Sequence, residues 1–264
     1  MNQVRSGDAA IAYEAFGHGP PVVLLHPFPA HHELWVPASQ LLTSRYRVIL
    51  PDLRGHGESE VGEGPATMEK HVSDLARVLD ECGVGRAIFA GVSVGGYVLF
   101  EFWRRCRSRV AGLVIVDSRP QADTSEARAN RLKAATDVVE HGSGPFLESL
   151  IPKLFGRTTL ETRPDLVDGT RPMMKKMSPQ AIAQVQQGMA ERPDSVPTLK
   201  TISVPTLVLI GAEDTLATVA DGELMRQHIA NSDLKIIPRA GHFSPWEQPE
   251  EVGRLLRQFA ERVS

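Results

Sequence analysis

The sequence of 264 residues is poor in cysteine, in long apolar runs and in unbalanced charge. Its two cysteines, Cys82 and Cys106, are too few for the disulfide framework of a secreted domain, and no cysteine–histidine spacing is typical of a zinc site. We therefore expect two free thiols in a reducing compartment. The longest apolar runs span only about four to six residues, which excludes a transmembrane helix.

The chain also has no large excess of charge of one sign. The 29 basic and 32 acidic side chains give a net charge of −3, so neither a nucleic-acid-binding surface nor a polyanionic tail is predicted. The first residues, MNQVRSGDAA, lack the apolar core of a signal peptide. Hydrophobic residues make up 42% of the chain, a value typical of a folded globular protein. We expect a soluble, cytoplasmic protein with no nucleic-acid or membrane partner.

Short apolar runs recur along the chain and predict buried strands. Their apolarity is continuous rather than alternating, which is typical of a parallel sheet covered by helices on both faces. The predicted strands are 22–25, 47–50, 87–90, 113–116 and 206–210, with a more polar edge strand at 234–237 and an antiparallel entry strand at 10–16.

Amphipathic segments between these runs predict helices at 68–82, 96–106 and 249–263. Strands and helices in alternation predict an α/β fold with a doubly wound, mostly parallel sheet. The order is interrupted at 119–200, which contains no strand-like run and is too long for a plain loop.

We interpret the interruption as a helical cap inserted between two core strands. Its helices are expected to be broken at Gly142, Gly144, Pro145, Pro152, Pro164, Pro172 and Pro179. The predicted organisation is a core in two parts, 1–118 and 201–264, with the cap at 119–200. Four of the seven methionines lie in the cap: Met173, Met174, Met177 and Met189. Methionine either adapts to varied apolar ligands or fills the cap's own core, and Met173 is our candidate for a substrate contact.

The segment Gly91-Val92-Ser93-Val94-Gly95 follows a predicted strand and precedes a predicted helix. In that context G-x-S-x-G predicts a nucleophile at a sharp turn. Side chains two residues before and after the serine would collide with the turn, so both positions need glycine. We expect Ser93 Oγ to project beyond the sheet at a helix N-terminus, which favours developing negative charge.

A serine nucleophile needs a base, and the base needs an orienting carboxylate. His242 follows the last predicted strand in a turn of small residues, at the sheet edge where such enzymes place ligands. Asp214 and Glu213 end the strand 206–210, and Asp117 ends the strand 113–116. All three compete for the orienting role. Asp214 is favoured because it lies further beyond its strand than Glu213.

Negative charge in the transition state needs backbone N–H donors. Val94 follows the nucleophile and supplies one. The loop His26-Pro27-Phe28-Pro29 follows the first buried strand, and because Pro27 has no N–H, we assign the second donor to Phe28. The alternative is that these prolines only end the strand. The Phe28 ring is expected to line the substrate pocket.

Two further side chains are candidate substrate contacts. His31 lies close to this loop in the sequence, although a solvated histidine is the alternative interpretation. Phe243 directly follows the proposed base and is expected at the edge of the pocket.

Together these segments resemble the α/β-hydrolase fold superfamily, and within it the capped esterases, enol-lactonases and cofactor-free haloperoxidase or perhydrolase relatives. The resemblance is carried by HPFP at 26–29, DLRGHGES at 52–59, GVSVGG at 91–96, GAED at 211–214 and GH at 241–242. The family usually has His-Gly where this chain has His26-Pro27. The resemblance implies that His26 supports the oxyanion loop and that 52–59 is a structural turn.

The expected activity is hydrolysis of a carboxylic ester of a small, fairly apolar substrate, without a metal or an organic cofactor. A lactonase or a perhydrolase with the same triad is an enzyme alternative, and a receptor-like binding module on the same fold is a non-enzyme alternative. The sequence leaves the substrate open, and also whether the chain forms a homo-oligomer.

Overall fold

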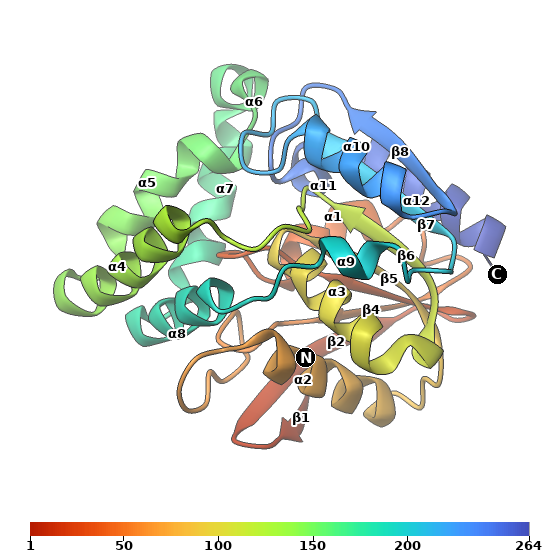
Figure 1. Cartoon of the computed structure of the whole chain (residues 1–264), viewed down its shortest axis with the longest axis horizontal. Coiled ribbons are helices and arrows are strands. Elements are labelled where there is room, and N and C mark those ends of the chain that lie inside the picture. Colours follow the sequence, from red (N-terminus) through yellow and green to blue (C-terminus); the bar gives the residue numbers. More distant parts are fainter. Residues whose placement is uncertain (264) are drawn as a thin grey trace.

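The apolar runs form the centre of one eight-stranded sheet with helices on both faces (Figure 1). The structure is a computed structural model that describes residues 1–263. The strands are β1 (Asn2–Ser6), β2 (Ala9–Phe16), β3 (Pro21–Leu25), β4 (Arg47–Pro51), β5 (Ala87–Val92), β6 (Val110–Val116), β7 (Thr206–Gly211) and β8 (Ser232–Ile237). The core helices are α1 (Val36–Ser39), α2 (Met68–Glu81), α3 (Val94–Cys106), α10 (Val219–His228), α11 (Ser244–Glu247) and α12 (Pro249–Val263).

The strand order is β1-β2-β4-β3-β5-β6-β7-β8. The six strands from β4 to β8 in this order are parallel, whereas β1 and β2 pair antiparallel to each other and β2 pairs antiparallel to β4. The predicted doubly wound, mostly parallel α/β sheet is therefore confirmed. Because the carboxyl ends of parallel strands share one sheet edge, the loops that follow β3, β5, β6 and β7 converge there.

Both faces of the sheet are apolar, as the continuous runs predict. In β3, Val23 and Leu25 belong to the core on the face of α2 and α3, whereas Val22 and Leu24 belong to the core on the face of α1 and α12. All four side chains are buried. This two-sided burial fixes the strand ends that carry the loops of the candidate site.

One strand was not predicted. Asn2–Ser6 forms β1 at the edge of the sheet, where only Val4 and Ser6 turn inward. An edge strand with one covered face needs few apolar residues, so its polar sequence gave no signal. The strand β8 closes the opposite edge, as its more polar sequence predicts.

The region between β6 and β7 consists of helices, which lie to one side of the sheet in Figure 1 apart from the short α9. They are α4 (Ser125–His141), α5 (Gly144–Leu154), α6 (Arg157–Thr162), α7 (Pro164–Lys175), α8 (Pro179–Ala190) and α9 (Val196–Leu199). The division of the chain at 118/119 and 200/201 into core and cap stays a prediction.

The prolines of this region act in two ways. Pro164 and Pro179 begin α7 and α8, where a missing N–H costs nothing. Pro152 and Pro172 lie inside α5 and α7, so the expectation that they break helices is wrong. Both occupy the last turn of their helix, so only two or three helical residues follow each proline.

Among residues 1–263, no helix combines the length and the apolarity that crossing a membrane requires.

Candidate active site

Ser93 lies between β5 and α3 in a backbone conformation that is rare for residues with a side chain. Its φ is +52°, in the region that favours glycine. A Cβ on Gly91 would lie 2.5 Å from the Gly95 carbonyl carbon, and a Cβ on Gly95 would lie 2.6 Å from the Leu25 oxygen. Both distances are too short for real atoms, so this turn requires the two glycines of G-x-S-x-G.

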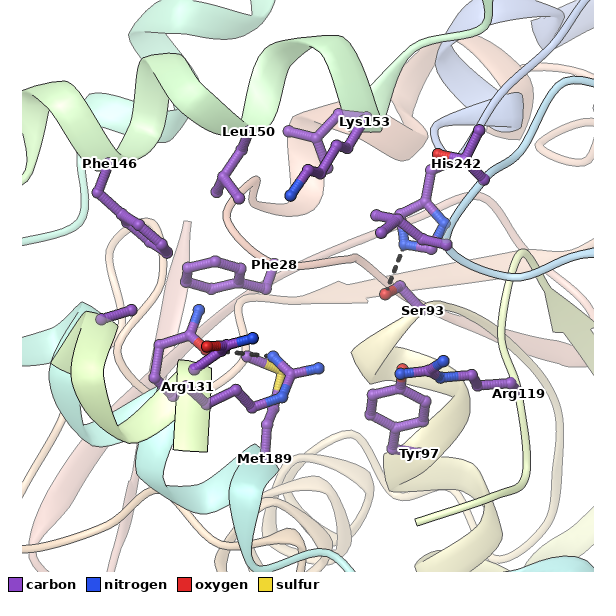
Figure 2. Close-up of a pocket in the computed structure, with 16 residues that line it drawn as sticks. Phe28, Ser93, Tyr97, Arg119, Arg131, Phe146, Leu150, Lys153, Met189 and His242 are labelled. Atoms are coloured by element: carbon purple, nitrogen blue, oxygen red, sulfur yellow. Dashed lines mark hydrogen bonds between the residues drawn. The ribbon is translucent and has the colours of Figure 1, made fainter. Parts of the chain in front are cut away.

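The turn directs Ser93 toward a histidine and an aspartate from two other strand ends. Ser93 Oγ lies 2.8 Å from His242 Nε2, and Figure 2 shows the two side chains pointing toward each other. His242 Nδ1 lies 2.8 Å from Asp214 Oδ2. The structure thus joins a hydroxyl, an imidazole and a carboxylate in one chain of hydrogen bonds, and both His242 and Asp214 are buried.

The two neighbouring acids Asp214 and Glu213 have different partners. Asp214 Oδ1 accepts hydrogen bonds from the N–H groups of Leu216 and Ala217, at 2.7 and 3.1 Å, which leaves Oδ2 for His242. Glu213 turns away to α6, where it accepts hydrogen bonds from the Thr158 N–H at 2.7 Å and from the Thr158 hydroxyl at 2.5 Å. Only Asp214 contacts the imidazole.

Asp117, the third candidate acid, lies behind the site. Its two oxygens accept hydrogen bonds from Gly211 N–H at 2.7 Å and Ser244 N–H at 3.1 Å. Burial, followed by the nearby charge of Asp214, raises the pKa of the Asp117 carboxyl well above its usual range. Asp117 therefore holds two strand-end loops together and does not contact His242.

Glu247 was missed in the sequence and supports the loop of His242. It is buried, and its two oxygens accept hydrogen bonds from Gly241 N–H and Gly156 N–H, both at 2.8 Å. Burial raises the pKa of Glu247. No sequence signal marks this residue, because its partners are backbone groups from the core and from the cap.

The two predicted oxyanion donors are Val94, next to Ser93 in the chain, and Phe28, which lines the same cavity as Ser93. Val94 is the first residue of α3, so its N–H has no acceptor within the helix. Phe28 lines the cavity beside Ser93, and within residues 1–263 its N–H donates to no other group. His26 Nε2 accepts a hydrogen bond from the Leu53 N–H at 2.8 Å and thereby fixes the loop that carries Phe28.

A cavity of about 310 Å³ opens in front of Ser93 and His242. This volume suits a small organic molecule. Figure 2 shows its apolar side, which is formed by Phe28, Phe146, Leu150, Leu154 and Met189.

Three predicted substrate contacts do not line this cavity. Met173 is buried among the apolar side chains of the cap, whereas Met189 on α8 faces the cavity. The side chain of Phe243 is fully buried and packs edge-on against Phe155, with ring centroids 5.7 Å apart. His31 is also buried, and its ring lies 5.1 Å from that of His32. These three expectations are corrected, because each side chain is buried against other side chains of the protein and does not reach the cavity.

The cavity also has basic side chains that the sequence interpretation did not identify. Arg119 follows β6, Arg131 lies on α4, and Lys153 lies on α5. None of the side chains lining the cavity within residues 1–263 is acidic. The direction of these basic side chains depends on how the cap helices pack onto the core, which periodicity alone does not give.

One group of side chains in the described part of the chain has the composition of a metal site: His31, His32 and Asp52. Both Asp52 oxygens already have protein partners, whereas His31 Nε2 is buried without one within residues 1–263. Asp52 Oδ1 accepts hydrogen bonds from both the backbone N–H and Nδ1 of His32, at 2.9 and 2.7 Å. Asp52 Oδ2 accepts a further hydrogen bond from Glu58 N–H at 2.9 Å. We interpret the group as a structural turn.

Comparisons with known proteins agree with this geometry. The 3-oxoadipate enol-lactonase 2 of Acinetobacter baylyi is 28% identical over 259 residues, which cover 97% of this chain and 95% of that protein. A thermophilic esterase from Thermogutta terrifontis is 38% identical, with a TM-score of 0.96 and coverage of 100% of this chain and 99% of that one. A hydrolase from Pseudomonas aeruginosa PA01 is 27% identical, with a TM-score of 0.91 and coverage of 98% and 97%.

The family model described as the alpha/beta hydrolase fold matches residues 20–249. The resemblance carried by the sequence motifs is thereby confirmed, and the chain belongs to the α/β-hydrolase fold family.

Proposed function

We propose that this protein hydrolyses a carboxylic ester of a small, fairly apolar substrate through an acyl-enzyme. Ser93 is the nucleophile, His242 the general base and Asp214 the group that orients the base. The observation that carries the proposal is the continuous hydrogen-bond chain from Ser93 Oγ through His242 to Asp214, with both distances at 2.8 Å.

In the first half of the reaction, His242 Nε2 takes the proton of Ser93 as Oγ attacks the ester carbonyl carbon. Asp214 keeps the proton of the imidazole on Nδ1 and stabilises the imidazolium that forms. The negative oxygen of the tetrahedral intermediate accepts hydrogen bonds from the N–H groups of Phe28 and Val94. His242 then gives its proton to the leaving alcohol.

In the second half, His242 removes a proton from a water molecule, which attacks the acyl carbon and forms a second tetrahedral intermediate. The same two N–H groups stabilise its oxyanion. Collapse of the intermediate releases the acid and returns the proton to Ser93. Every step of this scheme uses side chains, backbone N–H groups and water.

Lactone hydrolysis is the second candidate activity, because the relative from Acinetobacter baylyi is named an enol-lactonase. A lactone is an intramolecular ester, so the same steps open its ring. The esterase from Thermogutta terrifontis favours acyclic esters as the first class to test, since its identity to this chain is higher. A perhydrolase would form a peracid with the same triad.

The proposal is tested with a panel of p-nitrophenyl esters of increasing acyl length, a set of lactones, and a peracid assay. The wild type is expected to hydrolyse short esters or lactones, and Ser93→Ala to lose this activity by several orders of magnitude in kcat. Retention of wild-type activity by Ser93→Ala would refute the assignment. Tight retention of one ligand without turnover would favour the receptor-like alternative.

A further inference from the structure

The cavity in front of Ser93 carries positive charge that the reaction proposed above does not use. Arg119, Arg131 and Lys153 line it, with no acidic side chain beside them in the part of the chain that the structure describes. The inference below rests on the proposed function, because it concerns the substrate of the same site.

One buried carboxylate, that of Asp123, forms ion pairs with three arginines next to the cavity. Asp123 Oδ2 lies 2.6 Å from Arg131 Nε, and Asp123 Oδ1 lies 2.9 Å from Arg192 Nη1 and 3.3 Å from Arg119 Nη2. Burial disfavours the charged form of Asp123, but Arg131 and Arg192 hold the pKa of its carboxyl below the usual value. A single negative charge thus faces three guanidinium groups, which leaves two positive charges uncompensated.

Two of the cavity's basic side chains also have donors to spare. Arg119 Nε is buried and has no hydrogen-bond partner. Within residues 1–263, Lys153 has neither an ion pair nor a side-chain hydrogen bond, although it lies at the end of α5 next to the cavity. A buried donor without a partner is costly, so Arg119 is a site where a bound anion would add stability.

These groups line two opposite sides of the cavity. In Figure 2 the Lys153 side chain descends from α5 and ends above Phe28, whereas Arg119 and Arg131 lie on the opposite side, below Ser93 and Phe28. An anionic group bound in this cavity would share it with the side chains of Ser93 and His242, which line it as well.

We propose that the substrate is an ester or lactone that carries a carboxylate, which Arg119 binds with support from Arg131 and with electrostatic attraction from Lys153 across the cavity, while its carbon chain packs on the apolar side of the cavity. A carboxylate matches the planar edge of a guanidinium group and forms charge-assisted hydrogen bonds with it. The side chains of Arg119 and Arg131 are 34% and 21% exposed, and partial burial strengthens such bonds relative to bulk water.

The test compares two esters that differ only in charge at the chain end: mono-p-nitrophenyl adipate and p-nitrophenyl hexanoate. A second pair, 4-(butyryloxy)benzoate and phenyl butyrate, places the carboxylate on the alcohol part. For at least one pair, Lys153→Met and Arg119→Gln should lower kcat/KM for the charged ester by roughly 10- to 100-fold relative to the neutral one. Lys175→Met is the matched control, because Lys175 is an exposed cap lysine outside this cavity.

An unchanged ratio for both pairs in Lys153→Met and Arg119→Gln would overturn the carboxylate site while leaving the proposed ester hydrolysis intact. If the wild type hydrolyses neither these four esters nor any ester or lactone of the panel described above, the proposed function fails, and calorimetric binding of adipate still tests the anion site. Adipate is expected to bind the wild type and to lose roughly tenfold or more in affinity in Arg119→Gln. Absence of binding, or equally tight binding of inorganic phosphate, would contradict the proposal.

Discussion

Three acidic residues follow the ends of β6 and β7, and the hydrogen-bond partners of their carboxylate oxygens give each a different role. Asp214 gives one oxygen to two backbone N–H groups and the other to His242. Asp117 gives both oxygens to backbone N–H groups, and Glu213 binds Thr158 in α6. Only a carboxylate in contact with the imidazole can fix its tautomer, so the effect of each acid on catalysis should differ sharply.

Asp214→Asn is expected to lower kcat for ester hydrolysis by roughly 10³- to 10⁴-fold, because an amide cannot stabilise the imidazolium and favours the wrong tautomer. Steady-state kinetics with circular dichroism as a folding check measures this. Asp117→Asn is the matched control and is expected to lower Tm with a much smaller loss of kcat. Equal losses of kcat in the two variants would contradict the assignment of Asp214.

In the turn between β5 and α3, backbone segments lie so close together that there is no room for additional side chains. Ser93 adopts a positive φ, and Gly91 lies against the backbone of Gly95. The strain at Ser93 persists because the buried strand and the helix on each side fix the chain direction.

Gly91→Ala is expected to destabilise the protein by about 1–3 kcal/mol or more, because the new methyl group meets backbone atoms that cannot move freely. Thermal unfolding and ester hydrolysis should both show the defect. Gly85→Ala is the control, since a Cβ there meets nothing within 4 Å, and its effect should stay within about 0.5 kcal/mol. A wild-type Tm for Gly91→Ala would show that the turn tolerates a side chain.

The helix α2 buries a histidine that should make the fold sensitive to acid. Burial, followed by the charges on His56, Arg54 and Lys70, lowers the pKa of His71 from 6.5 to about 3. Neither ring nitrogen of His71 has a hydrogen-bond partner. Between these two pKa values the unfolded chain binds more protons than the folded one, so the free energy of unfolding falls as the pH falls.

His71→Leu should reduce this dependence by about 2 kcal/mol between about pH 7 and about pH 5, because leucine cannot bind a proton in the unfolded state. The measurement is Tm of wild type and variant across this pH range. A steeper loss of Tm in the variant, or equal slopes, would contradict the assignment of His71 as a buried neutral base.

The helical region between β6 and β7 contacts the rest of the fold at the loop of the proposed base. Glu247 joins Gly241 beside His242 to Gly156 of the cap through two hydrogen bonds of 2.8 Å. Glu213 adds a second connection to Thr158. The position of His242 therefore depends on how the segment that contains Gly156 and Thr158 packs against the loop of His242. A change at Glu247 should affect both stability and turnover.

Glu247→Gln should lower stability by about 1–3 kcal/mol, because an amide group places a donor against one of two buried N–H groups. We also expect a lower kcat with little change in KM. Glu161→Gln, an exposed cap residue with the same change of charge, is expected to match the wild type. Unchanged Tm and kcat in Glu247→Gln would show that these hydrogen bonds do not position the loop.

The sequence predicted the sheet and the sharp turn at Ser93, because continuous apolar runs indicate burial on both faces and G-x-S-x-G indicates a steric requirement. It did not predict β1, whose polar residues pair only along one edge. It selected Met173 although Met189 lines the cavity, because the inner face of a cap helix is decided by packing against distant residues. The arginines around Asp123 were missed for the same reason: they come from separate segments.

The proposed mechanism requires Ser93 to be an activated nucleophile, which a fluorophosphonate probe tests by covalent labelling. Peptide mapping by mass spectrometry should locate a single adduct on Ser93, with labelling lost in Ser93→Ala and strongly slowed in His242→Ala. An adduct on a different residue, or wild-type labelling rates without His242, would contradict the proposed mechanism.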